Sequence, residues 1–170
     1  METRVARVTV RATVLLAVTA VVAVVTGLPF VFPSLGPSAY ALATARERAV
    51  VTPDVVLGGH AIVVVAGLLA YHALAPGLTV TADLGAFSVP TARLGASGVV
   101  SVGLTTAGML VTDRVHPPAC ATTLIVALGI LPTVRESVVV LVAVACLLAA
   151  DAATTALAAR VTMLTNRMAA

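Results

Sequence analysis

Long apolar runs without a charge alternate with short charged connections along the whole of this chain. The runs cover residues 12–45, 55–82, 94–112, 115–134 and 137–150. A helix needs about 20 apolar residues to span the hydrocarbon core of a bilayer, and several of these runs reach that length. We therefore expect an all-α, polytopic membrane protein built as a bundle of transmembrane helices.

Prolines, glycines and polar residues set the ends of four long helices, which we predict near residues 8–28, 54–74, 91–111 and 135–159. A short polar tail is expected after the last helix, and a single membrane domain over residues 1–170 leaves no room for a soluble domain. The first apolar stretch is longer than the core of a usual signal peptide, so we predict a retained first helix.

Two apolar stretches between the long helices, residues 30–45 and 116–129, are too short for a comfortable span. Both open with prolines, which suit the first turn of a helix and forbid its continuation from upstream. Each stretch predicts an extended segment that feeds a short helix, with Pro37 or Pro118 near its first position. Short, proline-interrupted segments at matching places indicate a transporter built from repeats. We expect a two-fold internal repeat whose halves lie near 8–75 and 91–160.

The arginines indicate whether the two short segments cross the membrane or turn back. If both turn back, six arginines lie inside and four outside; if both cross, eight lie inside and two outside. The positive-inside rule favours crossing, which inverts one half relative to the other and puts the N-terminus in the cytoplasm. A multi-pass protein of the cell membrane is expected. The eight inside would be Arg4, Arg7, Arg11, Arg46, Arg48, Arg114, Arg160 and Arg167, and the two outside Arg93 and Arg135.

Composition argues against several classes of protein. Hydrophobic residues make up 60% of the chain and charged residues 10%, and the net charge of +3 is spread over helix ends. No basic stripe exists, so we expect no nucleic-acid partner. Cys120 and Cys146 lack metal-ligand spacing and are interpreted as small buried hydrophobes. Paired carboxylates and nucleophile–base spacings do not occur, so we expect neither a catalytic nor a metal site, and no cofactor.

The starts of the two short helices are candidates for an anion site. A helix that begins inside the membrane presents unpaired N–H groups and about half a positive charge, and two such ends facing each other suit a small monovalent anion. The alternative is that the hydroxyl groups only cap a helix or bond back to their own turn. The predicted binding groups are the amides of Ser38, Ala39, Tyr40, Ala119, Cys120 and Ala121 and the hydroxyls of Ser34, Ser38, Tyr40, Thr122 and Thr123.

Four ionisable residues lie in or beside apolar stretches. His116 precedes two prolines and either binds the substrate or couples protons, or else hydrogen-bonds the backbone that the prolines free. His60 follows a glycine pair within the second long helix, where an ionisable side chain is a candidate for function, here proton coupling. Asp151 is the acid within the last long helix, and we consider proton coupling and a structural salt bridge equally. His72, beside Tyr71, is expected to anchor the helix end at the interface.

The third long helix carries small residues about four positions apart, which permit close helix contact. We expect them to serve packing, within one chain or between protomers. A chain this small can hardly enclose a pathway alone, so a homo-oligomer is expected. The residues are Gly95, Ser97, Gly98, Ser101, Gly103 and Gly108.

Three blocks of sequence resemble one family. His116-Pro-Pro-Ala119, continuing Cys-Ala-Thr-Thr-Leu124, matches the signature that names the HPP family of membrane proteins. Residues 35–42 resemble the family's first broken segment, and Pro53 with Gly-Gly-His60 resembles the start of its second helix. Cys120 stands where the family usually has glycine, and Pro37 where a small residue is common. Some bacterial relatives also carry C-terminal CBS domains, which this chain lacks.

The resemblance implies a membrane protein with four helices, and plastid and cyanobacterial relatives are associated with nitrite transport. It therefore implies a transporter or channel for a small inorganic anion, with nitrite as a candidate. The alternatives are a membrane-embedded structural or regulatory subunit and an intramembrane enzyme, which the missing catalytic spacings disfavour.

Overall fold

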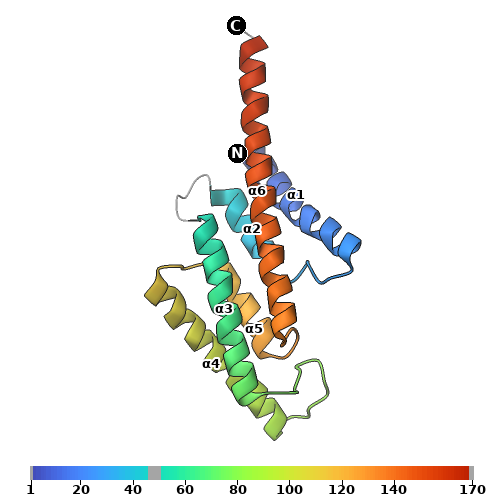
Figure 1. Ribbon diagram of the computed structural model, residues 1–170, viewed down its shortest axis with the longest axis vertical. Helices are drawn as coiled ribbons and strands as arrows, with labels where there is room; N and C mark the ends of the chain where they lie inside the picture. Colours follow the sequence, from blue (N-terminus) through green and yellow to red (C-terminus); the bar gives the residue numbers. More distant parts are fainter. Residues whose placement is uncertain (1, 46–50, 169–170) are drawn as a thin grey trace.

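The computed structural model describes residues 2–45 and 51–168, and within these ranges every regular element is a helix. Four long helices alternate with short ones (Figure 1). The elements are α1 (Glu2–Thr26), α2 (Leu35–Thr44), α3 (Pro53–Leu74), α4 (Val89–Thr112), the 3-10 turn η2 (Pro117–Ala119), α5 (Cys120–Ala127) and α6 (Val134–Met168). All four long helices are apolar and long enough to cross a membrane, so the predicted all-α membrane bundle is confirmed.

Local sequence explains where most of the helices begin. Thr52 and Ser88 accept hydrogen bonds from the amides of Val55 and Thr91, each at 3.3 Å, and prolines follow them in the first turn. A capping box starts α6, where Glu136 accepts from the Thr133 amide at 3.0 Å. These caps satisfy part of the orphan amides at the starts of α3, α4 and α6.

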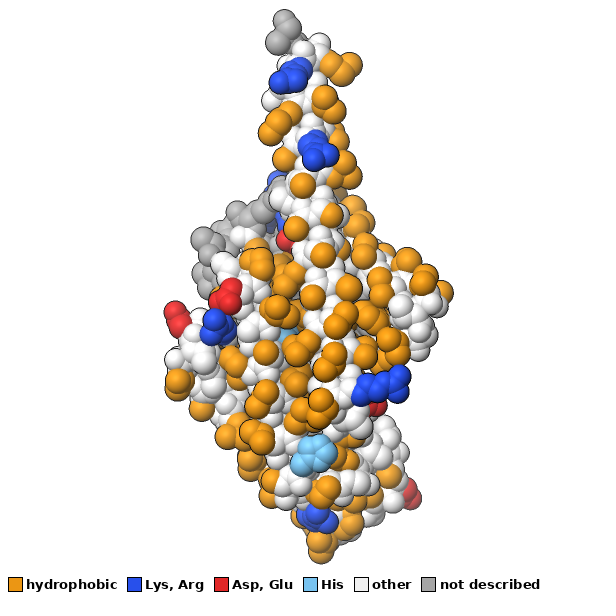
Figure 2. Space-filling model, in the orientation of Figure 1, with side chains coloured by type: hydrophobic (Ala, Val, Ile, Leu, Met, Phe, Trp, Pro, Cys, Tyr) orange, Lys and Arg blue, Asp and Glu red, His pale blue; other side chains and the backbone are white. Residues whose placement is uncertain are grey.

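The last helix differs from the prediction. We expected it to end near residue 159 with a polar tail, but α6 continues to Met168 and has 35 residues. No proline or glycine occurs after Pro132 in the chain, and Leu, Met, Ala and Arg in this stretch favour a helix. The projecting end of α6 carries basic side chains, whereas hydrophobic side chains cover most of the visible face (Figure 2).

The helix directions agree with the arrangement in which both short segments cross. In Figure 1, α1 and α3 run away from the end where both termini lie, and α4 and α6 run towards it. The chain therefore returns through α2 between α1 and α3, and through α5 between α4 and α6. The order long, short, long occurs twice, in opposite directions. That the two halves form a repeat, and which side of the membrane each end faces, stay predictions.

The described arginines separate into two groups. Arg114 contacts Asp54 at the start of α3, and Arg11 contacts Asp151 of α6. Arg93 instead donates to the carbonyl of Leu74 at the opposite end of α3, at 2.7 Å. Arg46 and Arg48 lie outside the described residues. Arg4, Arg7, Arg11, Arg114, Arg160 and Arg167 belong to the first part of α1, to the stretch just after α4 and to the end of α6, whereas Arg93 and Arg135 belong to the starts of α4 and α6.

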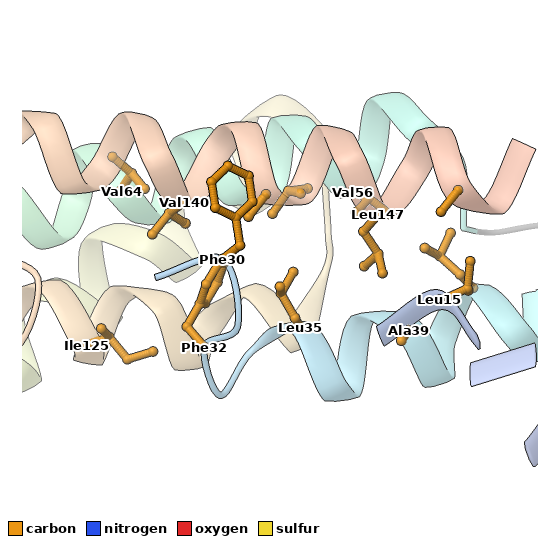
Figure 3. Packing of buried hydrophobic residues seen from close by; sticks show 14 residues of the cluster. Leu15, Phe30, Phe32, Leu35, Ala39, Val56, Val64, Ile125, Val140 and Leu147 are labelled. Carbon is orange, nitrogen blue, oxygen red and sulfur yellow. The ribbon is translucent and has the colours of Figure 1, made fainter. Parts of the chain in front are cut away.

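One apolar core joins the elements around α6. Phe30 and Phe32, from the link between α1 and α2, insert their rings between the helices (Figure 3). Val56 and Leu147 bring α3 against α6, and Leu15 adds α1. This core holds the start of α2 in the interior of the bundle. The helix α4 packs mainly on α3 and α5.

Candidate functional site

The starts of the two short helices meet inside the bundle, as the sequence predicts. Ser34, directly before α2, hydrogen-bonds Thr122 of α5 with 2.6 Å between the two hydroxyl oxygens. One turn further along α2, the hydroxyl of Ser38 lies 3.1 Å from Nε2 of His116, the residue before η2. All four side chains are buried, although they come from segments about 80 residues apart.

His60 joins this group from α3. Its ring centroid lies 5.4 Å from that of His116, with 45° between the planes. Nδ1 lies 2.8 Å from the carbonyl of Val56, and because a carbonyl only accepts, Nδ1 carries the proton. Nε2 is buried and has no hydrogen-bond partner, a state that costs about 1–3 kcal/mol for a polar atom. We call Ser34, Ser38, His60, His116 and Thr122 the polar cluster.

Glycines on α3 make the close approach of His116 and α5 possible. A Cβ at Gly59 would lie 2.8 Å from Cβ of His116, and one at Gly67 would lie 2.8 Å from Cβ of Val126. Such distances are shorter than side chains adopt, so each position requires glycine. The two glycines lie eight residues apart, on the same face of α3 as Val63.

Thr123 ties α5 to two long helices beside the polar cluster. Its hydroxyl donates to the carbonyl of Val63 at 3.0 Å and accepts from the hydroxyl of Thr105 at 3.0 Å. The single hydroxyl hydrogen is therefore used within the protein. The geometry gives Thr123 a structural task, and its contact with an anion stays a prediction.

Several of the backbone amides predicted to bind an anion have hydrogen-bond partners within the protein. The amide of Ser38 donates to the carbonyl of Ser34 at 3.2 Å, and that of Ala119 to His116 at 2.9 Å. Cys120 donates to Pro117, which completes the 3-10 turn. These amides have partners because each short helix is preceded by a turn that supplies carbonyls. Side chains, not amides, are the polar groups that remain at this place.

Other predicted site residues are placed in different surroundings. Ala39 and Ala119 are buried in apolar clusters, and Cys120 and Ala121 are half-buried beside them. Tyr40 is 63% exposed and does not share the face of α2 that carries Ser38. Positions two apart on a helix point in nearly opposite directions, so both side chains cannot reach one site.

Asp151 forms an ion pair away from the polar cluster. Its Oδ1 accepts from Nη2 of Arg11 at 2.6 Å and from Nε at 3.1 Å, and Nη2 also donates to Thr155 at 3.1 Å. Of the two interpretations of Asp151, this geometry favours the structural salt bridge. The sequence analysis names Arg11 only among the cytoplasmic arginines, and an acid within the apolar part of the last helix is the signal that points to a basic partner.

Sequence reasoning also missed Thr105. A signal exists, because Ser97, Ser101 and Thr105 follow one another at intervals of four along α4 and form a polar line on one helix face. Ser97 donates to the carbonyl of Ala127 at 2.8 Å, so this line binds the short helix α5 near its middle, at Thr123, and at its last residue. Of the glycines on α4, Gly98 contacts Leu124 and Leu128, whereas a Cβ at Gly95 or Gly103 would meet nothing within 4 Å.

Within the described residues, no three His, Cys, Asp or Glu side chains gather in a way that would hold a metal ion.

The fold and this site together define a multi-pass helical membrane protein with a buried pair of histidines at the meeting point of two short helices. The chain belongs to the HPP family: the family profile described as "HPP, transmembrane region" matches residues 2–168. Comparison with curated proteins and with solved structures finds no match.

Proposed function

We propose that this chain is a transporter or channel for a small monovalent inorganic anion, which passes through the polar cluster. The observation that carries the proposal is the unpartnered Nε2 of His60, buried beside His116 inside the helical bundle. An uncompensated polar atom in such a place is explained if a ligand or a proton occupies it during the working cycle. Nitrite is the first candidate, which the resemblance to the HPP family implies.

Protonation gives His60 the property that an anion needs. With Nδ1 bonded to Val56, an added proton goes to Nε2 and turns an acceptor into a charged donor. The hydroxyls of Ser34, Ser38 and Thr122 bond to one another or to His116, and each can rotate to donate to an anion. A proton and a monovalent anion bound together are neutral, which lowers the cost of crossing an apolar interior.

The two short helices are the elements expected to move. The polar cluster is at most 2% exposed, so an anion reaches it only after a rearrangement. Both α2 and η2–α5 follow prolines, which interrupt the backbone hydrogen bonding of a helix. We propose that they tilt apart at Ser34–Thr122 and Ser38–His116, opening the cluster to one side of the membrane at a time.

Anion flux into proteoliposomes tests the proposal, with His60→Gln and His72→Gln as a matched pair on α3. His72 is exposed, whereas His60 lies in the cluster. We expect His60→Gln to lower the initial rate of nitrite uptake about tenfold, the factor for a lost hydrogen bond of about 1.4 kcal/mol, and His72→Gln to leave it unchanged. Equal rates for the two folded variants would contradict the proposal. If the wild-type protein moves neither nitrite, nitrate nor chloride, the structural or regulatory alternative is favoured.

A further inference from the structure

The connection between α3 and α4 presents an aromatic side chain at the end of the molecule opposite the two termini (Figure 1). Phe87, two residues before α4, is 107% exposed, whereas the other two phenylalanines, Phe30 and Phe32, are each 5% exposed in the apolar core. Val89, the first residue of α4, is 73% exposed. The described part of the chain therefore does not shield this phenyl ring.

The backbone holds Phe87 in a strained conformation. Its φ is 55°, in the left-handed region that bulky residues rarely adopt, and Gly85 has a φ of 72°. Hydrogen bonds fix this turn. The Thr91 hydroxyl donates to the carbonyl of Gly85 at 2.9 Å, and the Ser88 hydroxyl accepts from the Thr91 amide at 3.3 Å and donates to its hydroxyl at 3.0 Å. Strain that neighbouring bonds maintain is found at functional contacts, and here it turns the ring away from the protein.

The start of α4 lies at the membrane boundary. Residues 94–112 carry no charge, whereas Asp83 and Arg93 stand just before them. At 1.5 Å per residue, Val89 lies about 6 Å from Arg93 along the helix axis, and the headgroup layer on each side of a bilayer is about 5–8 Å thick. With Arg93 at the inner edge of the headgroups, Phe87 and Val89 lie within the headgroup layer.

We propose that Phe87, with Val89 beside it, is a lipid anchor that inserts into the bilayer surface next to the start of α4. Aromatic side chains at headgroup depth anchor membrane proteins at the interface. Tyr71, at the same end of the bundle, does not serve this purpose, because it is buried and its hydroxyl bonds to Gly77 and Leu78. A protein partner suits the place less well, because a specific interface takes about 20 residues from each side, whereas lipid closes around a single ring.

Tryptophan fluorescence tests the anchor in the whole chain, which has no tryptophan of its own. Phe87→Trp is compared with Ala82→Trp, an exposed position in the same connection, in phosphatidylcholine vesicles with and without bromine on the upper part of the acyl chains. We expect brominated lipid to remove about half of the Phe87→Trp emission, because a ring at the boundary of headgroups and acyl chains contacts the bromine. Ala82→Trp should keep its emission in brominated lipid and be quenched by iodide in the water.

Two results would overturn the anchor. One is quenching of Phe87→Trp by iodide as strong as that of Ala82→Trp, without quenching by brominated lipid, which would place the ring in water. The other is emission at shorter wavelength that neither agent quenches, which would mean that a protein surface, such as a second copy of the chain, covers the ring.

Access to the start of α4 gives a second measurement. Asparagine adopts a positive φ readily, so Phe87→Asn removes the ring and keeps the turn. Val89→Cys, in a background that lacks Cys120 and Cys146, should then react faster with a membrane-impermeant thiol reagent than it does with Phe87 present. An unchanged rate would show that Phe87 does not hold the start of α4 in the lipid.

Discussion

His60 combines a fixed tautomer with an unpartnered nitrogen, and this combination leads to a pH dependence of flux. The carbonyl of Val56 holds the Nδ1 proton, so acidification adds the second proton at Nε2 and creates a positive charge in the polar cluster. Anion uptake should therefore rise as the pH falls below neutrality. Uptake by wild type and His60→Gln across a pH series checks this, and a variant that keeps the wild-type pH dependence would exclude His60 as the coupling group.

Thr123 is predicted to matter for stability and not for substrate. Thr123→Val keeps the volume but removes the bonds to Val63 and Thr105, and it should lower the free energy of unfolding by about 1–3 kcal/mol. Thr106→Val is the matched control, because the exposed Thr106 hydroxyl bonds only to its own turn at Val102. Thermal unfolding in detergent measures both. Unchanged stability together with lost nitrite uptake would return Thr123 to the binding site.

A double variant tests whether Asp151 serves a structural salt bridge or proton coupling. Asp151→Asn leaves Arg11 without its charge partner in a partly buried place, with 16% and 19% of the two side chains exposed, and should destabilise the protein by about 1–3 kcal/mol. Arg11→Gln combined with Asp151→Asn should recover part of this loss. If Asp151→Asn instead keeps its stability and removes the pH dependence of uptake, proton coupling is the role of Asp151.

Some glycines are needed for close contact between helices and others are not. Gly67→Ala would place a Cβ 2.8 Å from Val126 and 3.0 Å from the Thr123 carbonyl oxygen, so overpacking should cost about 1–3 kcal/mol. Gly103→Ala, in α4, meets nothing within 4 Å and should leave monomer stability unchanged or slightly raised. Thermal unfolding separates the two. Equal effects would mean that α5 adapts to a Cβ on α3.

Much of the element arrangement is predictable because its signals are local. The signals for a helix start lie next to each other in the sequence. They are Thr52 before Pro53, Ser88 shortly before Pro90, and His116 before two prolines at the start of the short helix. The end of α6 is not signalled, because no breaker follows Pro132. The sequence alone also indicates that Ser38 and Tyr40 point to different sides of α2, because positions two apart cannot share a helix face.

Contacts between distant segments are less predictable. The convergence of Ser38 with His116 follows from the idea of two facing short helices. The bond from Thr123 to the Val63 carbonyl does not, because it depends on how closely Gly67 lets α5 approach. The pair of Arg11 with Asp151 is also hard to predict. The two residues lie 140 positions apart, and their proximity depends on the directions of α1 and α6.

At the scale of the whole molecule, the alternating helix directions determine which arginines share a side. If the short segments cross, Arg114→Cys should react with a membrane-impermeant thiol reagent only from the cytoplasm and Arg93→Cys only from outside, in a background that lacks Cys120 and Cys146. Loss of the exposed Arg114–Asp54 pair costs little. With the N-terminus shown separately to be cytoplasmic, the reverse labelling of both positions would restore the arrangement in which the short segments turn back. Arg48, an equivalent position, lies outside the described residues.

The homo-oligomer also remains a prediction at this scale. A Cβ at Gly95 or Gly103 of α4 would meet nothing within 4 Å in the described chain, so a second copy has room to approach there. A bulky Gly103→Leu substitution should shift the size of the detergent-solubilised complex if a second copy packs there. An unchanged mass by light scattering would place any subunit contact elsewhere.

The helix α6 is longer than a membrane span needs to be, and its end projects from the bundle. Its 35 residues extend about 50 Å, well beyond the roughly 30 Å of hydrocarbon that a bilayer presents. Its buried contacts lie between Ser137 and Ala150, so a small tilt of this embedded part would become a larger displacement at Met168. Paired spin labels, one near Met168 and one on the exposed start of α1, would therefore show rearrangements of the membrane-embedded helices as a change in the distance between the two labels.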